Sequence, residues 1–211
     1  MLEPLSLLPV NTDAPHVENI EPGEVYYLSY GSNLSHDRFF CYIQGGQPEG
    51  NSHIYKGCRN TLIPVLSFGV TFDAALYFSG DSKIWGGGGA MFADFSQPGE
   101  SLGRAYRITL EQFCDVAAQE SDLPIGSVDF DWDELLSNGF IEGDGQYGTL
   151  VLVGYLHGLP VLTFTNAQGV QDKPLDPPSV AYRKVIARGL EETFQMNDSE
   201  IENYFQNVLG Y

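Results

Sequence analysis

Positive charge is scarce in this chain of 211 residues, which has 10 lysines and arginines against 28 aspartates and glutamates. The formal net charge of −18 at pH 7 repels nucleic acid and anionic membrane surfaces, so the sequence argues against both as partners. Acidity of this kind more often serves solubility than the binding of a cation.

Cysteine and histidine are also rare and scattered. The three cysteines are Cys41, Cys58 and Cys114, and no two of them form a Cys-x-x-Cys pair. The four histidines do not stand at spacings typical of metal ligands. The pattern predicts reduced thiols in a cytoplasmic protein, with no metal and no organic cofactor.

Long apolar runs are missing as well. Residues 1–22 lack the basic start and continuous apolar core of a signal peptide, and no stretch is long enough to span a membrane. Because 43% of the residues are hydrophobic, we expect one globular domain over 1–211 and not disorder. Its expected parts are an N-terminal arm (1–22), a core (23–192) with an insertion at 122–147, and a C-terminal helix (193–211).

What the sequence does contain is a strand that stops at a glycine turn. Residues 25–30 form an apolar run typical of a buried strand, and Gly31-Ser32-Asn33 ends it before a short helix expected over 35–43. A strand, a tight turn and a helix start aim several backbone N–H groups at one point, which suits an anion. Many such turns serve geometry alone, so this feature by itself leaves both interpretations open.

Patterns of apolar and turn-forming residues predict the remaining elements. The expected strands cover residues 63–68, 74–78, 90–95, 103–108, 148–156 and 160–165, and the last two form a hairpin. The expected later helices begin at Thr109, Ser179 and near Asn197. A run of four glycines after Trp85 offers a backbone that a ligand can approach closely, but it lacks the Lys-Ser/Thr of a P-loop.

The helix after Thr109 carries the most informative acid. Thr109 and Gln112 form a capping box, and the helical period places Glu120 beside Phe113 at the margin of the apolar face. Partial desolvation there would raise the pKa of a carboxyl and suit it to act as a base near neutrality. Periodicity alone favours the alternative, a solvated Glu120 at a fraying helix end. The far face, expected to meet solvent, holds Gln112, Asp115 and Gln119.

Residues 122–147 form an acidic insertion. The spacing of Asp129, Asp131 and Asp133 invites a calcium interpretation, but the glycine and the distal glutamate of an EF-hand loop are missing. Aromatic residues alternate with the acids. We therefore expect a half-exposed hairpin or a short helix.

Three motifs in order give the sequence a family resemblance. They are Tyr30-Gly31-Ser32-Asn33-Leu34 after the first strand, residues 103–108 running into a helix that ends Ala118-Gln119-Glu120, and residues 177–182 opening a helix that continues to Glu192. Over about residues 25–192 the chain resembles the γ-glutamylcyclotransferase superfamily. Trp85-Gly86-Gly87 is similar to a tryptophan-containing loop of some members.

The resemblance implies an α+β fold, a small mixed β-barrel flanked by helices with a pocket at one barrel end. It implies that Glu120 is the general acid/base of an enzyme that converts a γ-glutamyl compound to 5-oxoproline, a reaction of glutathione metabolism. The substrate-binding residues that it implies are Tyr30, Gly31, Ser32, Asn33, Leu34, Trp85, Gly86 and Tyr182. The oligomeric state stays open, a homodimer included.

Two departures from the family pattern concern the identity of the substrate. The insertion is longer than in compact members, and Leu162 and Phe164 stand where some members carry a tyrosine. Two alternatives therefore remain. The fold could be a non-catalytic module that binds a small molecule, or the enzyme could act on γ-glutamylamines or ε-(γ-glutamyl)lysine.

Overall fold

The computed structural model describes residues 5–7, 23–49, 51–171 and 174–209. Most of the expected N-terminal arm therefore lies outside the described residues. The part that is described includes strand β1 (Leu5–Ser6), which pairs in parallel with β3 (Ser67–Asp73).

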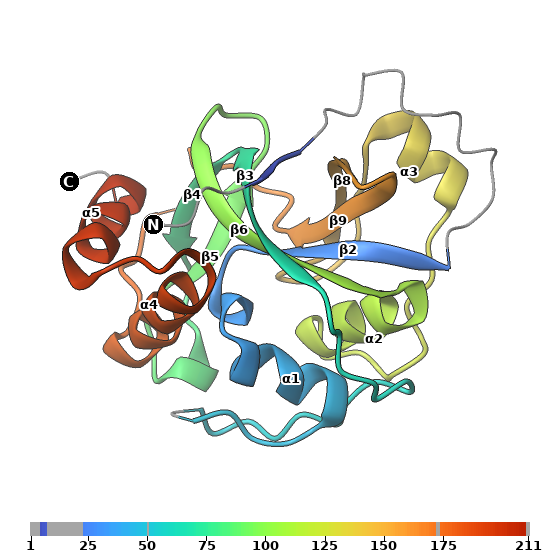
Figure 1. Cartoon of the computed structure of the whole chain (residues 1–211), viewed down its shortest axis with the longest axis horizontal. Helices are drawn as coiled ribbons and strands as arrows, with labels where there is room; N and C mark the ends of the chain where they lie inside the picture. Colours follow the sequence, from blue (N-terminus) through green and yellow to red (C-terminus); the bar gives the residue numbers. More distant parts are fainter. Residues whose placement is uncertain (1–4, 8–22, 50, 172–173, 210–211) are drawn as a thin grey trace.

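A seven-stranded mixed sheet is the centre of the molecule (Figure 1), with the strand order β1-β3-β6-β2-β9-β8-β7. Strand β2 (Glu24–Ser29) lies in its middle, antiparallel to β6 (Glu100–Thr109) and parallel to β9 (Leu159–Thr165). The predicted hairpin is confirmed, since β8 (Thr149–Leu156) pairs antiparallel with β9. Short β7 (Phe140–Ile141) completes the sheet.

The predicted α+β class is confirmed, but the described sheet is not a closed barrel. Strands β4 (Ala75–Ser79) and β5 (Ala90–Asp94) form a separate two-stranded ribbon. Because these two strands pair with each other, the main sheet ends at β1 and β7 and its edges do not join.

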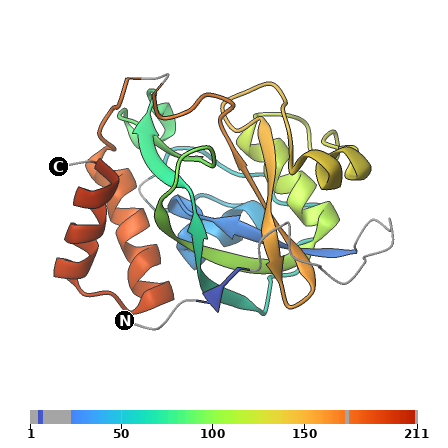
Figure 2. The same cartoon turned by 90° about the horizontal axis from the view of Figure 1, so that it is seen from above.

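The described residues form five α-helices, which pack around the sheet (Figures 1 and 2). Their bounds are α1 (His36–Gln44), α2 (Leu110–Glu120), α3 (Trp132–Asn138), α4 (Val180–Phe194) and α5 (Asp198–Leu209). Helices α4 and α5 run side by side at one end of the molecule, and α3 lies at the other. Two 3-10 helices add short turns, η1 (Ser32–Leu34) and η2 (Lys83–Trp85).

The middle of strand β2, residues 25–28, is apolar, as expected for a strand that is buried on both faces. Val25 and Tyr27 pack in a cluster with residues of α1 and α2, whereas Tyr26 and Leu28 pack in a second cluster with residues of α4. This double burial fixes the strand, and therefore fixes the position of the turn that follows it.

Three expectations from the sequence need correction or refinement. The expected strand over 63–68 is wrong for its first four residues, which form an exposed coil in which Val65 is 94% exposed. The pattern of apolar residues there has no partner strand to pack on. The insertion contains α3, which is the short helix of the two expected forms, and the Asp131 side chain caps it.

The far face of α2 does not meet solvent as expected. Asp115 is completely buried and Gln112 is 3% exposed, because the chain around residues 57–62 packs over this face. Arg59 donates to Asp115 through its backbone and its guanidinium, and Gln112 donates to the carbonyl oxygens of Asn60 and Leu62. These hydrogen bonds make burial of the polar groups tolerable.

Candidate active site

The turn after β2 brings the chain close to α4. Gly31 has a φ of −108°, so it does not use the left-handed conformation that glycine allows. A Cβ at this position would instead lie 3.1 Å from the hydroxyl oxygen of Tyr182. The glycine therefore allows a close approach between the turn and the tyrosine.

Two side chains of β6 donate hydrogen bonds to the carbonyl groups of the turn. The Arg104 guanidinium donates to the Leu34 carbonyl at 2.9 Å, and the Tyr106 hydroxyl donates to the Asn33 carbonyl at 2.9 Å. The Leu34 N–H donates to Gly31 within the turn. The N–H groups of Ser32 and Asn33 have no acceptor among the described residues, as is usual for the first residues of a helical turn.

Glu120 is the last residue of α2, and its side chain contacts this turn. The capping box predicted for the start of α2 is present, and it fixes the phase of the helix. The Asn33 side-chain amide donates to Glu120 Oε1 at 3.1 Å and to the Tyr27 hydroxyl at 3.1 Å. The side chain of Asn33 thus links β2 to the carboxylate at the end of α2.

The carboxyl of Glu120 is poorly solvated. Desolvation by burial raises its pKa above the usual value, although the charge of Arg38 and hydrogen bonds from Tyr42 and Asn33 act against the rise. A carboxyl with a raised pKa can accept a proton and release it again near neutrality. The Glu120 residue is half-buried, which agrees with the expected position at the margin of the apolar face.

A cavity of about 330 Å³ opens in front of Glu120. Of the predicted substrate-binding residues, those that line the cavity are Tyr30, Gly31, Ser32, Asn33, Trp85 and Tyr182. Leu34 is buried in the core, and Gly86 closes η2 with a φ of +77°, so neither of these two residues lines the cavity.

Several cavity residues were not predicted from the sequence. They are Tyr27, Arg38, Tyr42, Tyr55 and Tyr147. Arg38 and Tyr42 stand four residues apart on α1, a spacing that places two polar groups on one helix face and could have been noticed. Tyr55 and Tyr147 come from irregular segments, where no periodicity indicates the direction of a side chain.

The cavity holds buried polar atoms that have no hydrogen-bond partner among the described residues. They are Ser29 Oγ, Asn33 Oδ1, and Nε and Nη1 of Arg38. Unsatisfied buried groups are uncommon in folded proteins and are costly. Their concentration beside Glu120 marks this cavity as a place where a polar ligand would gain hydrogen bonds.

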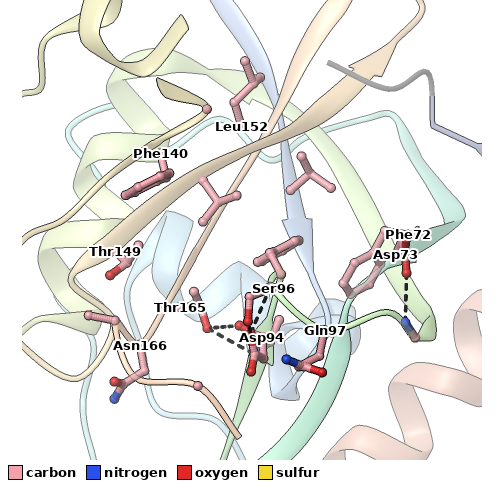
Figure 3. A pocket seen from close by; sticks show the side chains of 18 of the residues that line it. Phe72, Asp73, Asp94, Ser96, Gln97, Phe140, Thr149, Leu152, Thr165 and Asn166 are labelled. Carbon is pink, nitrogen blue, oxygen red and sulfur yellow. Dashed lines mark hydrogen bonds between the residues drawn. The ribbon is translucent and has the colours of Figure 1, made fainter. Parts of the chain in front are cut away.

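A larger cavity, of about 1240 Å³, lies along β5, β8 and β9 (Figure 3). Its most buried acid is Asp94, which accepts hydrogen bonds from the backbone and hydroxyl of Ser96 and from the Val170 N–H. These bonds lower the pKa of Asp94 against the opposing effect of burial. The carboxylate of Asp94 is thus engaged in anchoring the loop after β9. We therefore place the candidate active site in the smaller cavity, which contains Glu120.

Two further observations concern the described residues as a whole. They contain no group of three or more His, Cys, Asp or Glu side chains arranged to hold a metal ion. None of their helices combines the length and apolarity that crossing a membrane requires.

Comparison with known proteins supports the fold and leaves the reaction open. No protein-family model matches this chain. The chain is 33% identical over 208 residues to Histone deacetylase 5 of Arabidopsis thaliana; the match covers 89% of the chain but only 31% of that protein. The chain therefore spans about a third of the length of this curated relative.

Solved structures that are similar to the chain include a human protein and a gamma-glutamyl cyclotransferase. An uncharacterized human protein, loc79017, aligns with a TM-score of 0.50 and 18% identity, covering 86% of each chain. A structure named gamma-glutamyl cyclotransferase aligns with a TM-score of 0.49 and 16% identity, covering 85% of each chain. At 18% identity the likeness to the human structure concerns the fold alone, and it agrees with the α+β class predicted from the sequence.

Proposed function

We propose that the cavity in front of Glu120 is the active site of a γ-glutamylcyclotransferase-like enzyme. In this reaction the α-amine of a γ-glutamyl compound attacks its own γ-carbonyl carbon. A C–N bond closes the five-membered ring of 5-oxoproline, and the original amide C–N bond breaks to release an amine or amino acid. The observation that carries the proposal is the desolvated Glu120 carboxyl, hydrogen-bonded to Asn33 of the glycine turn.

Glu120 would move the proton that the reaction requires. The α-ammonium group must lose a proton before it can attack, and the leaving nitrogen must gain one. One carboxylate that faces both nitrogens can do both in turn, and its raised pKa suits the second step. Since the attack is intramolecular, a correctly held substrate gains about 7–11 kcal/mol from orientation and proximity.

The glycine turn would stabilise the negative charge of the substrate or of the tetrahedral intermediate. The N–H groups of Ser32 and Asn33 are available for this purpose, whereas that of Leu34 is used within the turn. Trp85 and Tyr182, whose ring centroids lie 5.4 Å apart, would form the wall against the aliphatic part of the substrate.

The substrate would be a compound of the kind found in glutathione metabolism. Cys41 and Cys58 are free thiols, which agrees with a reducing compartment such as the cytoplasm. The direct test is to incubate the purified protein with γ-glutamyl amino acids, γ-glutamylamines and ε-(γ-glutamyl)lysine, and to measure the release of 5-oxoproline.

The variant Glu120→Gln tests the proposed base. Glutamine keeps the volume and can still accept the Asn33 hydrogen bond, but it cannot take a proton. General acid–base groups contribute about 10²–10⁴-fold, and we expect kcat to fall by at least that factor. Circular dichroism should show an unchanged fold. A Glu120→Gln enzyme with nearly wild-type turnover would contradict the assignment.

A second candidate is a binding module without catalysis. The match to about a third of a longer protein supports it, because a domain within a larger chain can serve to recognise a small molecule. The two candidates differ in one measurement. A binding module would bind 5-oxoproline or a γ-glutamyl compound in calorimetry and would release no product from any member of the panel.

A further inference from the structure

Arg38 is a buried cation that lines the same cavity as Glu120. Its side chain projects from α1 and is 2% exposed, and no carboxylate of the described residues forms an ion pair with it. Its guanidinium lies 4.4 Å from the ring centroid of Tyr42 and 4.3 Å from that of Tyr55. A buried charge is costly unless other groups compensate it, so this arrangement needs an explanation.

The hydroxyl groups of the two tyrosines supply part of the compensation. Nη2 of Arg38 donates to the Tyr42 oxygen at 2.9 Å and to the Tyr55 oxygen at 2.6 Å. Each phenol has one proton of its own, which is therefore directed away from the guanidinium. All three side chains line the cavity that contains Glu120.

Tyr42 accepts a hydrogen bond from Arg38 and shares the cavity with Glu120. The interaction between the Tyr42 hydroxyl and the Glu120 carboxyl lowers the pKa of Glu120, and the charge of Arg38 lowers it further. Burial raises the pKa of Tyr42 well above its usual value, so the phenol keeps the proton that it donates. Arg38 and its acceptor Tyr42 thus line one cavity with Glu120, where the proton of the phenol is available to the candidate base.

We propose that Arg38 is a positioning residue, which sets the charge state of Glu120 through Tyr42 and keeps the phenols of Tyr42 and Tyr55 oriented as proton donors. Its part in turnover rests on the proposed function. Its effect on Glu120 does not, because that effect exists in the free protein.

Burial and Arg38 act on Glu120 in opposite directions. Without the cation, the carboxyl would remain protonated to a higher pH and could not accept the proton of an α-ammonium group. Besides Arg38 and Glu120, the titratable groups that line the same cavity are Tyr27, Tyr30, Tyr42, His53, Tyr55, Asp81, Lys83, Asp122, Tyr147 and Tyr182.

The test is the titration of Glu120 in the free protein. Carbon-13 labelling of the glutamate carboxyls allows NMR to follow Glu120, whose signal is identified by its loss in Glu120→Gln. In Arg38→Met, we expect the pKa of Glu120 to move upward by roughly one pH unit or more. Arg38→Lys keeps a charge at the site and should move it less. Arg107→Met, which removes an exposed arginine on β6, is the control and should leave it unchanged.

Tyr42→Phe keeps the proposal testable if Arg38→Met does not fold. It keeps the ring and removes the hydroxyl, so the pKa of Glu120 should again rise. In the active enzyme, the acidic limb of the pH–kcat profile should move in the same direction in both variants. An unchanged Glu120 titration in folded Arg38→Met or Tyr42→Phe protein would overturn the inference. Because the titration needs no substrate, it decides the inference even if the protein releases no 5-oxoproline.

Discussion

At the scale of single residues, the candidate site depends on one acid placed where water is scarce. The folded protein raises the pKa of Glu120 above the value of about 4.3 that a glutamate has in an unfolded chain. Folding therefore favours the protonated form of this group. The stability that this preference contributes is present below the unfolded pKa and is lost as the pH rises through the folded pKa.

Glu120→Gln should consequently gain stability relative to the wild type as the pH rises. Glutamine does not ionise, so the difference in melting temperature, variant minus wild type, should be larger at pH 8 than at pH 4. Thermal unfolding across this range measures the difference. Glu111→Gln, an exposed change on the same helix, is the control. A difference that stayed constant with pH would mean that the protein does not perturb the ionisation of Glu120.

Gly31 should matter more for binding than for folding. Valine at this position would place its Cβ against the Tyr182 hydroxyl, 3.1 Å away, and would crowd the cavity. We expect Gly31→Val to weaken the binding of 5-oxoproline strongly and to lower the melting temperature only modestly. Ser32→Ala should cost less affinity if the serine contributes mainly its N–H group. Unchanged affinity in folded Gly31→Val protein would remove the turn from the site.

The sequence could predict that Glu120 lies at a half-buried helix margin, but it could not predict the contacts of Arg38. The reason is physical. The capping box sets the phase of α2, and a phase is enough to place a residue on a helix margin. The role of Arg38 depends on Tyr55, which lies 17 residues away in an irregular segment. Contacts of that kind are decided by how the loop packs, and local patterns carry no information about them.

At the scale of elements, helix α4 holds the glycine turn in place. A Cβ on Gly189 would lie 2.4 Å from the Cβ of Leu34 and 2.6 Å from the backbone nitrogen of Ser35. The carboxylate of Glu192, one turn further along, accepts from the His36 N–H at the start of α1. The helix therefore touches the turn and the next helix at the same time.

Gly189→Ala should destabilise the protein, because backbone atoms of the turn would have to move. Overpacking typically costs about 1–3 kcal/mol, and we expect a loss in that range in denaturant unfolding. Substrate affinity should fall as well, since the displaced atoms belong to the candidate site. Gly23→Ala, where an added Cβ meets nothing within 4 Å, is the matched control. Wild-type stability in Gly189→Ala would mean that α4 does not clamp the turn.

Helices were predicted better than strands because helix caps are local in the sequence, whereas strand pairing depends on distant segments. The caps of α2 and α4 are local hydrogen bonds, and both are present as predicted from Thr109 and Ser179. A strand needs a partner that the local pattern does not specify. Residues 63–66 have the composition of a strand and remain a coil, and the closed barrel fails because β4 and β5 pair with each other.

At the scale of the whole molecule, the charge of −18 conflicts with an anionic substrate. A γ-glutamyl amino acid carries two carboxylates and one ammonium group, so its net charge is −1. A γ-glutamylamine carries one of each and has no net charge. Repulsion between the protein and the first kind of substrate acts over the Debye length, which is about 30 Å at 0.01 M salt and about 10 Å at 0.1 M.

Salt should therefore distinguish the two substrate classes. As the ionic strength rises from low to physiological values, kcat/KM for a γ-glutamyl amino acid should increase a few-fold, because screening removes the repulsion during approach. The value for a γ-glutamylamine should stay nearly constant, which makes it the internal control. Steady-state kinetics over a salt series at fixed pH measures both. A fall in kcat/KM with salt for the anionic substrate would instead mean that the positive charge of Arg38 and Lys83 at the cavity outweighs the net charge of the molecule.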